Sequence, residues 1–173
     1  MSARFPFCPD TYKGRPALRV ETGALRALFL PEDGGKLASL TAPDGFEFLC
    51  QNPAPAYARL AYDGRYIESE CASWDDMFPT IDPYTPLTGR YAGIAFRADS
   101  RLFPVSFCKE VRAEADGALA LTYTLTNRGD VAFPCLWAAH CMLRGQDDLR
   151  IRTPFPADAP VDYMFGATPA DAL

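Results

Sequence analysis

The sequence predicts a mainly β protein built from antiparallel strands. Three observations support this class: short runs in which apolar and polar residues alternate, turn signals between these runs, and the lack of any helical apolar stripe three turns long. The chain has 173 residues, of which 49% are hydrophobic, so it can bury the core of one domain. We therefore assign residues 1–173 to a single domain.

The first half of the chain contains four predicted strands. Gly23-Ala24 is a hairpin signal that joins the first two of them. A turn at residues 32–35 precedes the third strand, and Asp44-Gly45 turns the chain into the fourth. These strands cover residues 17–22, 25–30, 36–41 and 46–49.

The second half of the chain repeats this pattern. A turn at residues 114–117 separates strands predicted at 105–113 and 119–126, and in the latter Leu and Tyr share one face while Ala and Thr share the other. After a turn at 127–130, the run 133–143 is typical of a buried strand. Residues 149–153 complete the set with another alternation.

The only histidine, His140, lies in the run 133–143. Imidazole gives and takes protons near neutral pH, so His140 is the first candidate for proton transfer. Its neighbours Leu136, Ala138 and Met142 also fit a second interpretation, a core histidine hydrogen-bonded to a carbonyl group. From this segment alone we favour the core interpretation, since buried polar groups usually find a partner.

Between the strand groups, residues 51–91 are rich in Pro, Tyr, Trp, Asp and Gly. Such loops concentrate binding residues. Sugar recognition needs an aromatic face under the ring, which Trp74, Phe78 or Tyr84 offers, and polar groups for the hydroxyls. Alternatively, Phe78 and Ile81 are core residues, and we favour this interpretation for these two. Asp75 and Asp76 fit a solvated turn as well as a ligand contact. The candidate polar ligands of a sugar are Arg65, Asp75, Asp76 and Asp82.

Charge and hydropathy exclude two classes of partner. The net charge is −5 and the arginines are scattered, which argues against nucleic-acid binding. No apolar stretch reaches the length of a membrane span, and residues 1–7 lack the apolar core of a signal peptide. We therefore expect a soluble, cytoplasmic protein that does not bind membranes.

The six cysteines include no Cys-x-x-Cys pair, which suits free thiols. Cys135 and Cys141 flank His140 and raise the alternative of a metal site. Regular alternation would turn Cys135 away from His140, and the chain has no second imidazole. We therefore predict no metal site.

Five ordered blocks span the chain from about Tyr12 to Pro154. They are Glu32-Asp-Gly-Gly-Lys-Leu-Ala-Ser-Leu40 with Glu47-Phe-Leu-Cys-Gln51, Trp74-Asp-Asp-Met-Phe-Pro-Thr-Ile-Asp82, residues 119–127, and Trp137-Ala-Ala-His140. Together these blocks resemble the galactose mutarotase-like (aldose 1-epimerase) superfamily. The resemblance implies an antiparallel β-supersandwich with a sugar cleft on one concave face. It also implies a hexose or related sugar as substrate, a role in carbohydrate metabolism, and no cofactor.

The resemblance implies an isomerase that interconverts the anomers of a sugar by opening its ring. A carboxylate takes the proton of the anomeric hydroxyl, an imidazole protonates the ring oxygen, and the aldehyde rotates before the ring closes. His140 matches the family histidine of a Trp-x-x-His context at a strand end. It is the residue to which the resemblance assigns the catalytic role.

Two family features have no match in this sequence: a second histidine in a Pro-Asp-His-Gly type segment, and a catalytic glutamate beyond the histidine strand. We therefore expect a partial domain, truncated in its second half, with impaired epimerase activity. The alternatives are a non-catalytic carbohydrate-binding or interaction module on the same fold, and an unrelated β-sandwich with a structural histidine. Exposed sheet edges would allow copies of the chain to pair with one another as a homo-oligomer.

Overall fold

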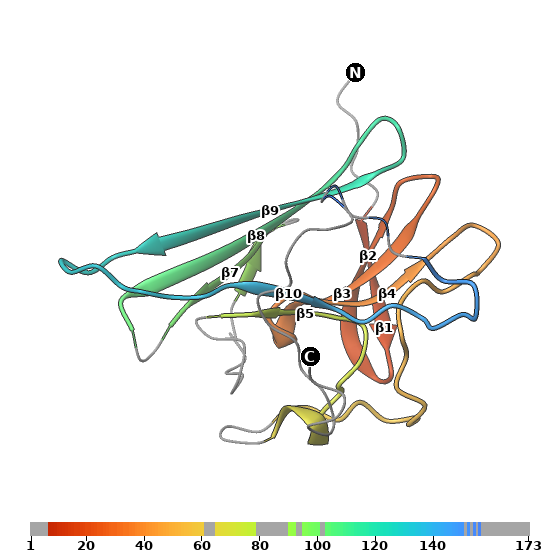
Figure 1. Ribbon diagram of the computed structural model, residues 1–173, viewed down its shortest axis with the longest axis horizontal. Helices are drawn as coiled ribbons and strands as arrows, with labels where there is room; N and C mark the ends of the chain where they lie inside the picture. Colours follow the sequence, from red (N-terminus) through yellow and green to blue (C-terminus); the bar gives the residue numbers. More distant parts are fainter. Residues whose placement is uncertain are drawn as a thin grey trace.

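A computed structural model of the chain describes residues 7–60, 65–78, 90–92, 95–100, 103–150, 152, 154 and 156 (Figure 1). In this part of the chain the structure is mainly antiparallel β, with two single-turn 3-10 helices, which confirms the predicted class. The strands form two sheets, in the orders β1-β2-β3-β4-β5-β10 and β6-β7-β8-β9.

The larger sheet begins as an antiparallel meander of four strands that are consecutive in sequence. The hairpin predicted at Gly23-Ala24 joins the second strand to the third, and a single residue pair, Leu37 with Trp74, joins the meander to β5. Strand β10 then pairs with β5, placing His140 opposite Asp75. The strands are β1 (Phe7–Tyr12), β2 (Arg15–Glu21), β3 (Arg26–Leu30), β4 (Lys36–Thr41), β5 (Trp74–Met77) and β10 (Ala138–Cys141).

The smaller sheet contains the long hairpin of β8 and β9, which projects past the larger sheet in Figure 1. The turn predicted at residues 114–117 connects these two strands; β8 has the predicted bounds, and β9 extends one residue beyond its predicted end. The strands are β6 (Arg90–Ala92), β7 (Ala95–Asp99), β8 (Val105–Ala113) and β9 (Leu119–Asn127).

The main core lies between the two sheets. Phe29 of β3 meets Phe96 of β7, with 5.5 Å between ring centroids. A separate small cluster of Ala17, Leu30 and Ala38 lies on the other face of the larger sheet, because successive residues of a strand point to opposite faces. The main cluster is Leu18, Val20, Ala27, Phe29, Leu37, Leu49, Phe96 and Val111.

A tight turn brings the larger sheet close to the smaller one. The 3-10 helix η1 (Pro31–Asp33) ends at Gly34 and Gly35, whose φ angles are +70° and +75°. A Cβ atom at Gly35 would lie 2.7 Å from Cγ of Phe96, closer than any real contact. Glycine is therefore needed here for both its backbone conformation and its small size.

Some strand predictions are wrong. Residues 46–49 form only isolated bridges, through Glu47 and Leu49, and Leu149 lies outside any regular strand. The run 133–143 contains only the short strand β10, and Leu136 and His140 are exposed instead of buried. The reason is that β10 is the last strand of the larger sheet, and the described residues do not cover it.

The outer edge of β9 is unusual because it carries no charge. Within the described chain, β9 pairs with β8 alone, and none of its nine residues is an Asp, Glu, Lys, Arg or His. Natural edge strands are commonly protected by charged side chains. Exposed apolar side chains also lie in and after this strand, at Leu125, Val131 and Leu136. We propose that two copies of the chain associate through this edge.

Sedimentation velocity tests this association. We expect the wild-type chain to sediment faster as its concentration rises, and Thr124→Lys, which adds a charge on β9, to remain monomeric. The matched control is Thr11→Lys, because Thr11 is exposed on β1, the edge strand at the far end of the larger sheet. A wild-type chain that stays monomeric at all concentrations would refute the proposal.

Candidate functional site

Two neighbouring carboxylates of β5 point to opposite faces of the sheet, and each meets a buried lysine. On one face, Nζ of Lys36 lies 2.6 Å from Oδ2 of Asp75, and on the other, Nζ of Lys109 lies 2.8 Å from Oδ2 of Asp76. Lys36 also donates to the carbonyl oxygens of Glu70, at 3.2 Å, and Ala72, at 2.5 Å. Both carboxylates are thereby engaged in structural ion pairs.

The Lys109 pair lies inside the sandwich. Its ammonium group donates to the carbonyl oxygen of Gly35 at 3.0 Å and sits over the rings of Phe29 and Tyr123. Burial lowers the pKa of Lys109, and the charge of Asp76 opposes this shift. Burial, followed by the charge of Asp76, raises the pKa of Tyr123. The pair therefore carries a large desolvation cost that each partner offsets for the other.

Several polar atoms near this pair make no hydrogen bond within the described part of the chain. They include Oδ1 of Asp76, the hydroxyl of Tyr123 and the indole nitrogen of Trp137. The ring centroids of Tyr123 and Trp137 are 4.6 Å apart. The hydroxyl of Tyr123 and the indole nitrogen of Trp137 therefore belong to side chains that pack against each other. The interior between the sheets is thus polar as well as aromatic at this point.

His140 lies on the face of β5 and β10 that carries Asp75. Its side chain is exposed, and Nδ1 lies 3.4 Å from the hydroxyl oxygen of Tyr66. Tyr66 begins the 3-10 helix η2 (Tyr66–Glu68), and its hydroxyl donates to Oδ2 of Asp75 at 2.7 Å. A chain of contacts therefore runs from buried Lys36 through Asp75 and Tyr66 to the exposed imidazole.

The hydroxyl of Tyr66 remains protonated across the working range of pH. Burial of its phenol, followed by the negative charge of Asp75, raises the pKa of Tyr66 well above its usual value. The hydroxyl can therefore both donate and accept hydrogen bonds next to His140.

A second buried carboxylate on this side of the sheet is Glu70. Its Oε1 accepts from Nζ of Lys13 at 2.5 Å and from the hydroxyl of Tyr12 at 3.4 Å. Tyr12 also donates to Oε1 of Gln51 at 2.8 Å. Burial and then the charge of Glu70 raise the pKa of Tyr12, so Tyr12 resembles Tyr66 in its environment. Within the described part of the chain, Tyr12 makes no hydrogen bond or ring contact with His140.

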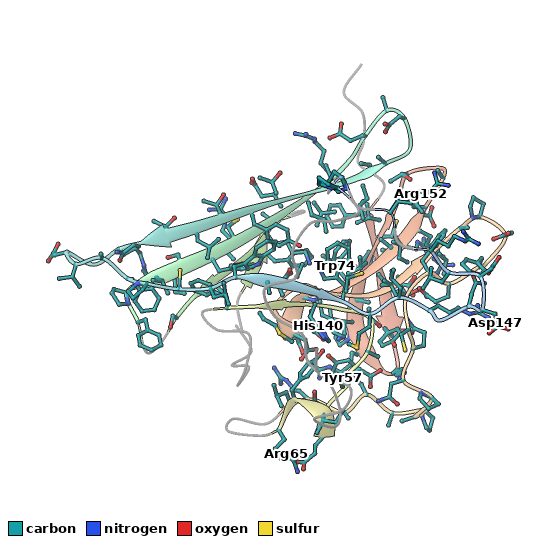
Figure 2. The ribbon with its side chains drawn as sticks, viewed as in Figure 1. Tyr57, Arg65, Trp74, His140, Asp147 and Arg152 are labelled. Atoms are coloured by element: carbon teal, nitrogen blue, oxygen red, sulfur yellow. The ribbon has the colours of Figure 1, made fainter. Side chains whose placement is uncertain are left out.

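The structure brings together two of the predicted site residues, His140 and Asp75. Asp76 lies on the opposite face of the sheet from Asp75. Trp74 shares the face of Asp76, where it is half-buried and packs against the main core cluster. Figure 2 labels Trp74, His140 and Arg65. Arg65 is exposed and pairs with Glu68 at 3.3 Å. Their roles in binding a sugar stay predictions.

Three of the loop residues weighed above, Asp82, Ile81 and Tyr84, lie outside the described residues. Phe78 is 2% exposed and packs with Val105 and Phe107, which confirms its interpretation as a core residue.

Sequence reasoning missed the residues that organise this site, namely Lys36, Tyr66, Glu70 and Lys109. A signal existed for Lys109, because Val105, Phe107, Lys109 and Val111 alternate on the inward face of β8. No comparable signal marks Tyr66, which reaches Asp75 from a loop.

All six cysteines of the chain are free. Among the described residues, no cluster of three or more His, Cys, Asp or Glu side chains is arranged to hold a metal ion. The described chain likewise contains no helix with the length and hydropathy needed to span a membrane.

Comparisons with known protein families, with curated proteins and with solved structures found no match. The chemistry of His140 and its neighbours is therefore the basis for assigning a function. An exposed imidazole that is held by a protonated phenol can exchange a proton, and hydrogen bonds, with a polar ligand at the surface.

Proposed function

We propose that this chain is a carbohydrate-binding protein of the galactose mutarotase-like type, which binds a hexose or related sugar at the surface around His140. The observation that carries the proposal is the exposed imidazole of His140, supported from behind by Tyr66 and Asp75. The order of the sequence blocks described above supports a fold of the mutarotase-like supersandwich type, and the six free thiols support a reducing compartment such as the cytoplasm.

Sugar hydroxyls need donors and acceptors that are accessible at the surface. The imidazole of His140 offers one ring nitrogen for such a contact, because the other faces Tyr66. Arg65, which precedes Tyr66 in the chain, keeps its guanidinium group in solvent, with the side chain 77% exposed. This group is free to reorient toward vicinal hydroxyls, since surface ion pairs such as the one with Glu68 are weak.

Catalysis of anomer interconversion requires a base as well as an acid. Asp75 and Asp76 are both buried and held by lysines, so neither is placed to take a proton from an anomeric hydroxyl. This observation favours the non-catalytic alternative, a binding module, over an efficient epimerase. We therefore expect the chain to bind sugar and to accelerate its anomerisation little.

Nuclear magnetic resonance tests binding, because the single histidine gives one set of imidazole signals. We expect glucose or galactose to shift the signals of His140 in a saturable way. Sorbitol is the matched control, since it has the hydroxyls but no ring, and should cause a smaller shift. The absence of a shift with any hexose at high concentration would contradict the proposal.

Polarimetry on the same sample separates the two function classes. A well-placed acid or base contributes about 10²- to 10⁴-fold to a rate. We expect an anomerisation rate close to that of buffer. An acceleration of about a hundredfold that disappears in His140→Ala would instead show an active epimerase.

A further inference from the structure

We propose that Tyr66 is a positioning residue that fixes the tautomer of His140, so that Nδ1 keeps its proton and Nε2 is the atom that contacts a ligand. The statement about the ligand rests on the proposed function. The statement about the tautomer does not, since it concerns the protein alone.

The charge of Asp75 decides how Tyr66 can bond to it. Its carboxylate is buried and accepts from the ammonium group of Lys36 at 2.6 Å. A carboxylate in a buried ion pair can only accept hydrogen bonds. Every group that approaches it, including Tyr66, must therefore act as a donor.

The single hydroxyl proton of Tyr66 decides which hydrogen bonds the phenol donates and which it accepts. The acceptors within its reach include Oδ2 of Asp75 at 2.7 Å and Nδ1 of His140 at 3.4 Å. Hydrogen bonds to an ionised acceptor are shorter and about twice as strong as neutral ones. The proton therefore lies on the bond to Asp75, and the oxygen of Tyr66 presents a lone pair to His140.

The tautomer of His140 follows from the lone pair that Tyr66 presents to its imidazole. A neutral histidine carries one N–H, and the hydrogen bond of one nitrogen decides the state of the other. Next to the lone pair of Tyr66, Nδ1 carries the hydrogen, so Nε2 has the lone pair. When His140 is protonated, the added proton is on Nε2. The same atom thus accepts from a ligand hydroxyl in the neutral form and donates to a ligand oxygen in the charged form.

The nitrogen chemical shifts of the neutral His140 ring test this assignment without any sugar. We expect a protonated Nδ1 and an unprotonated Nε2 in the wild-type chain. In Tyr66→Phe, which keeps the ring and removes the hydroxyl, we expect the Nδ1–H signal to be lost and the Nε2–H tautomer, which unstructured peptides favour, to become the major one.

Tyr12→Phe is the matched control. Tyr12 is also a half-buried tyrosine bonded to a buried carboxylate, Glu70, on the same side of the sheet. This variant should lose similar stability and leave the tautomer of His140 unchanged, which separates positioning from general loosening of the fold. Circular dichroism confirms that both variants fold.

Three outcomes are distinct. A wild-type His140 protonated on Nε2, or a tautomer that Tyr66→Phe does not change, would overturn the positioning role. A confirmed Nδ1–H tautomer in a chain that binds no hexose supports the positioning role and refutes the proposed function. A confirmed tautomer with hexose binding that weakens in Tyr66→Phe but not in Tyr12→Phe supports both.

Discussion

Replacing Lys109 with methionine is expected to lower the free energy of unfolding by about 3–5 kcal/mol, the usual cost of removing one partner from a buried ion pair. Methionine keeps most of the volume of lysine but leaves Asp76 charged inside the sandwich. In the described chain Asp76 forms no ion pair with another cation, and its Oδ1 already lacks a hydrogen bond. Urea denaturation followed by circular dichroism measures the loss.

Two further variants separate the buried charge from other effects. Arg112→Met changes a cation of the same strand whose ion pair with Glu114 is exposed, and it should cost less than about 1 kcal/mol. The double variant Lys109→Met with Asp76→Leu removes both charges and should recover most of the stability, because buried pairs are often replaceable by apolar residues. Equal losses in Lys109→Met and Arg112→Met would contradict this account.

A methyl group added at Gly35 should also be strongly destabilising. The φ angle of +75° costs a non-glycine residue about 1–2 kcal/mol, and overpacking of a core costs about 1–3 kcal/mol. The added Cβ would meet the ring of Phe96, which is fixed against Phe29 in the main core. We therefore expect Gly35→Ala to lower the free energy of unfolding by about 2–5 kcal/mol in the same denaturation assay.

Gly45→Ala is the matched control for this prediction. Gly45 has a φ angle of +88° but nothing lies within 4 Å of its added Cβ. It should therefore lose only the conformational part, about 1–2 kcal/mol. A loss in Gly35→Ala no larger than that in Gly45→Ala would show that Phe96 moves aside at little cost.

The fold class could be predicted because alternation and turns are local signals. The pairs β2–β3 and β8–β9 are hairpins, so the residues that specify them are neighbours in sequence. Strand β5 was missed because two of its four residues are aspartates, which hydropathy assigns to the surface. Only their lysine partners, from distant strands, explain why a buried strand carries them.

The candidate site shows the same limit. The chemistry of His140 was visible in the sequence, since it is the only imidazole. Its exposure was not, because the apolar residues around it are typical of a buried strand. The contact with Tyr66 spans 74 positions of the chain and is created by the loop that carries η2, so no local pattern predicts it.

The long connection between β5 and β10 has a consequence for the order of folding. Two residues separate Tyr12 of β1 from Arg15 of β2, whereas 60 residues, 78–137, separate β5 from β10. By the logarithmic dependence of loop-closure entropy on length, the longer closure costs about 3 kcal/mol more. The β6–β9 strands lie within this interval and shorten it when they form. We therefore expect the smaller sheet to assemble before β10 docks on β5, so that the surface around His140 is completed last.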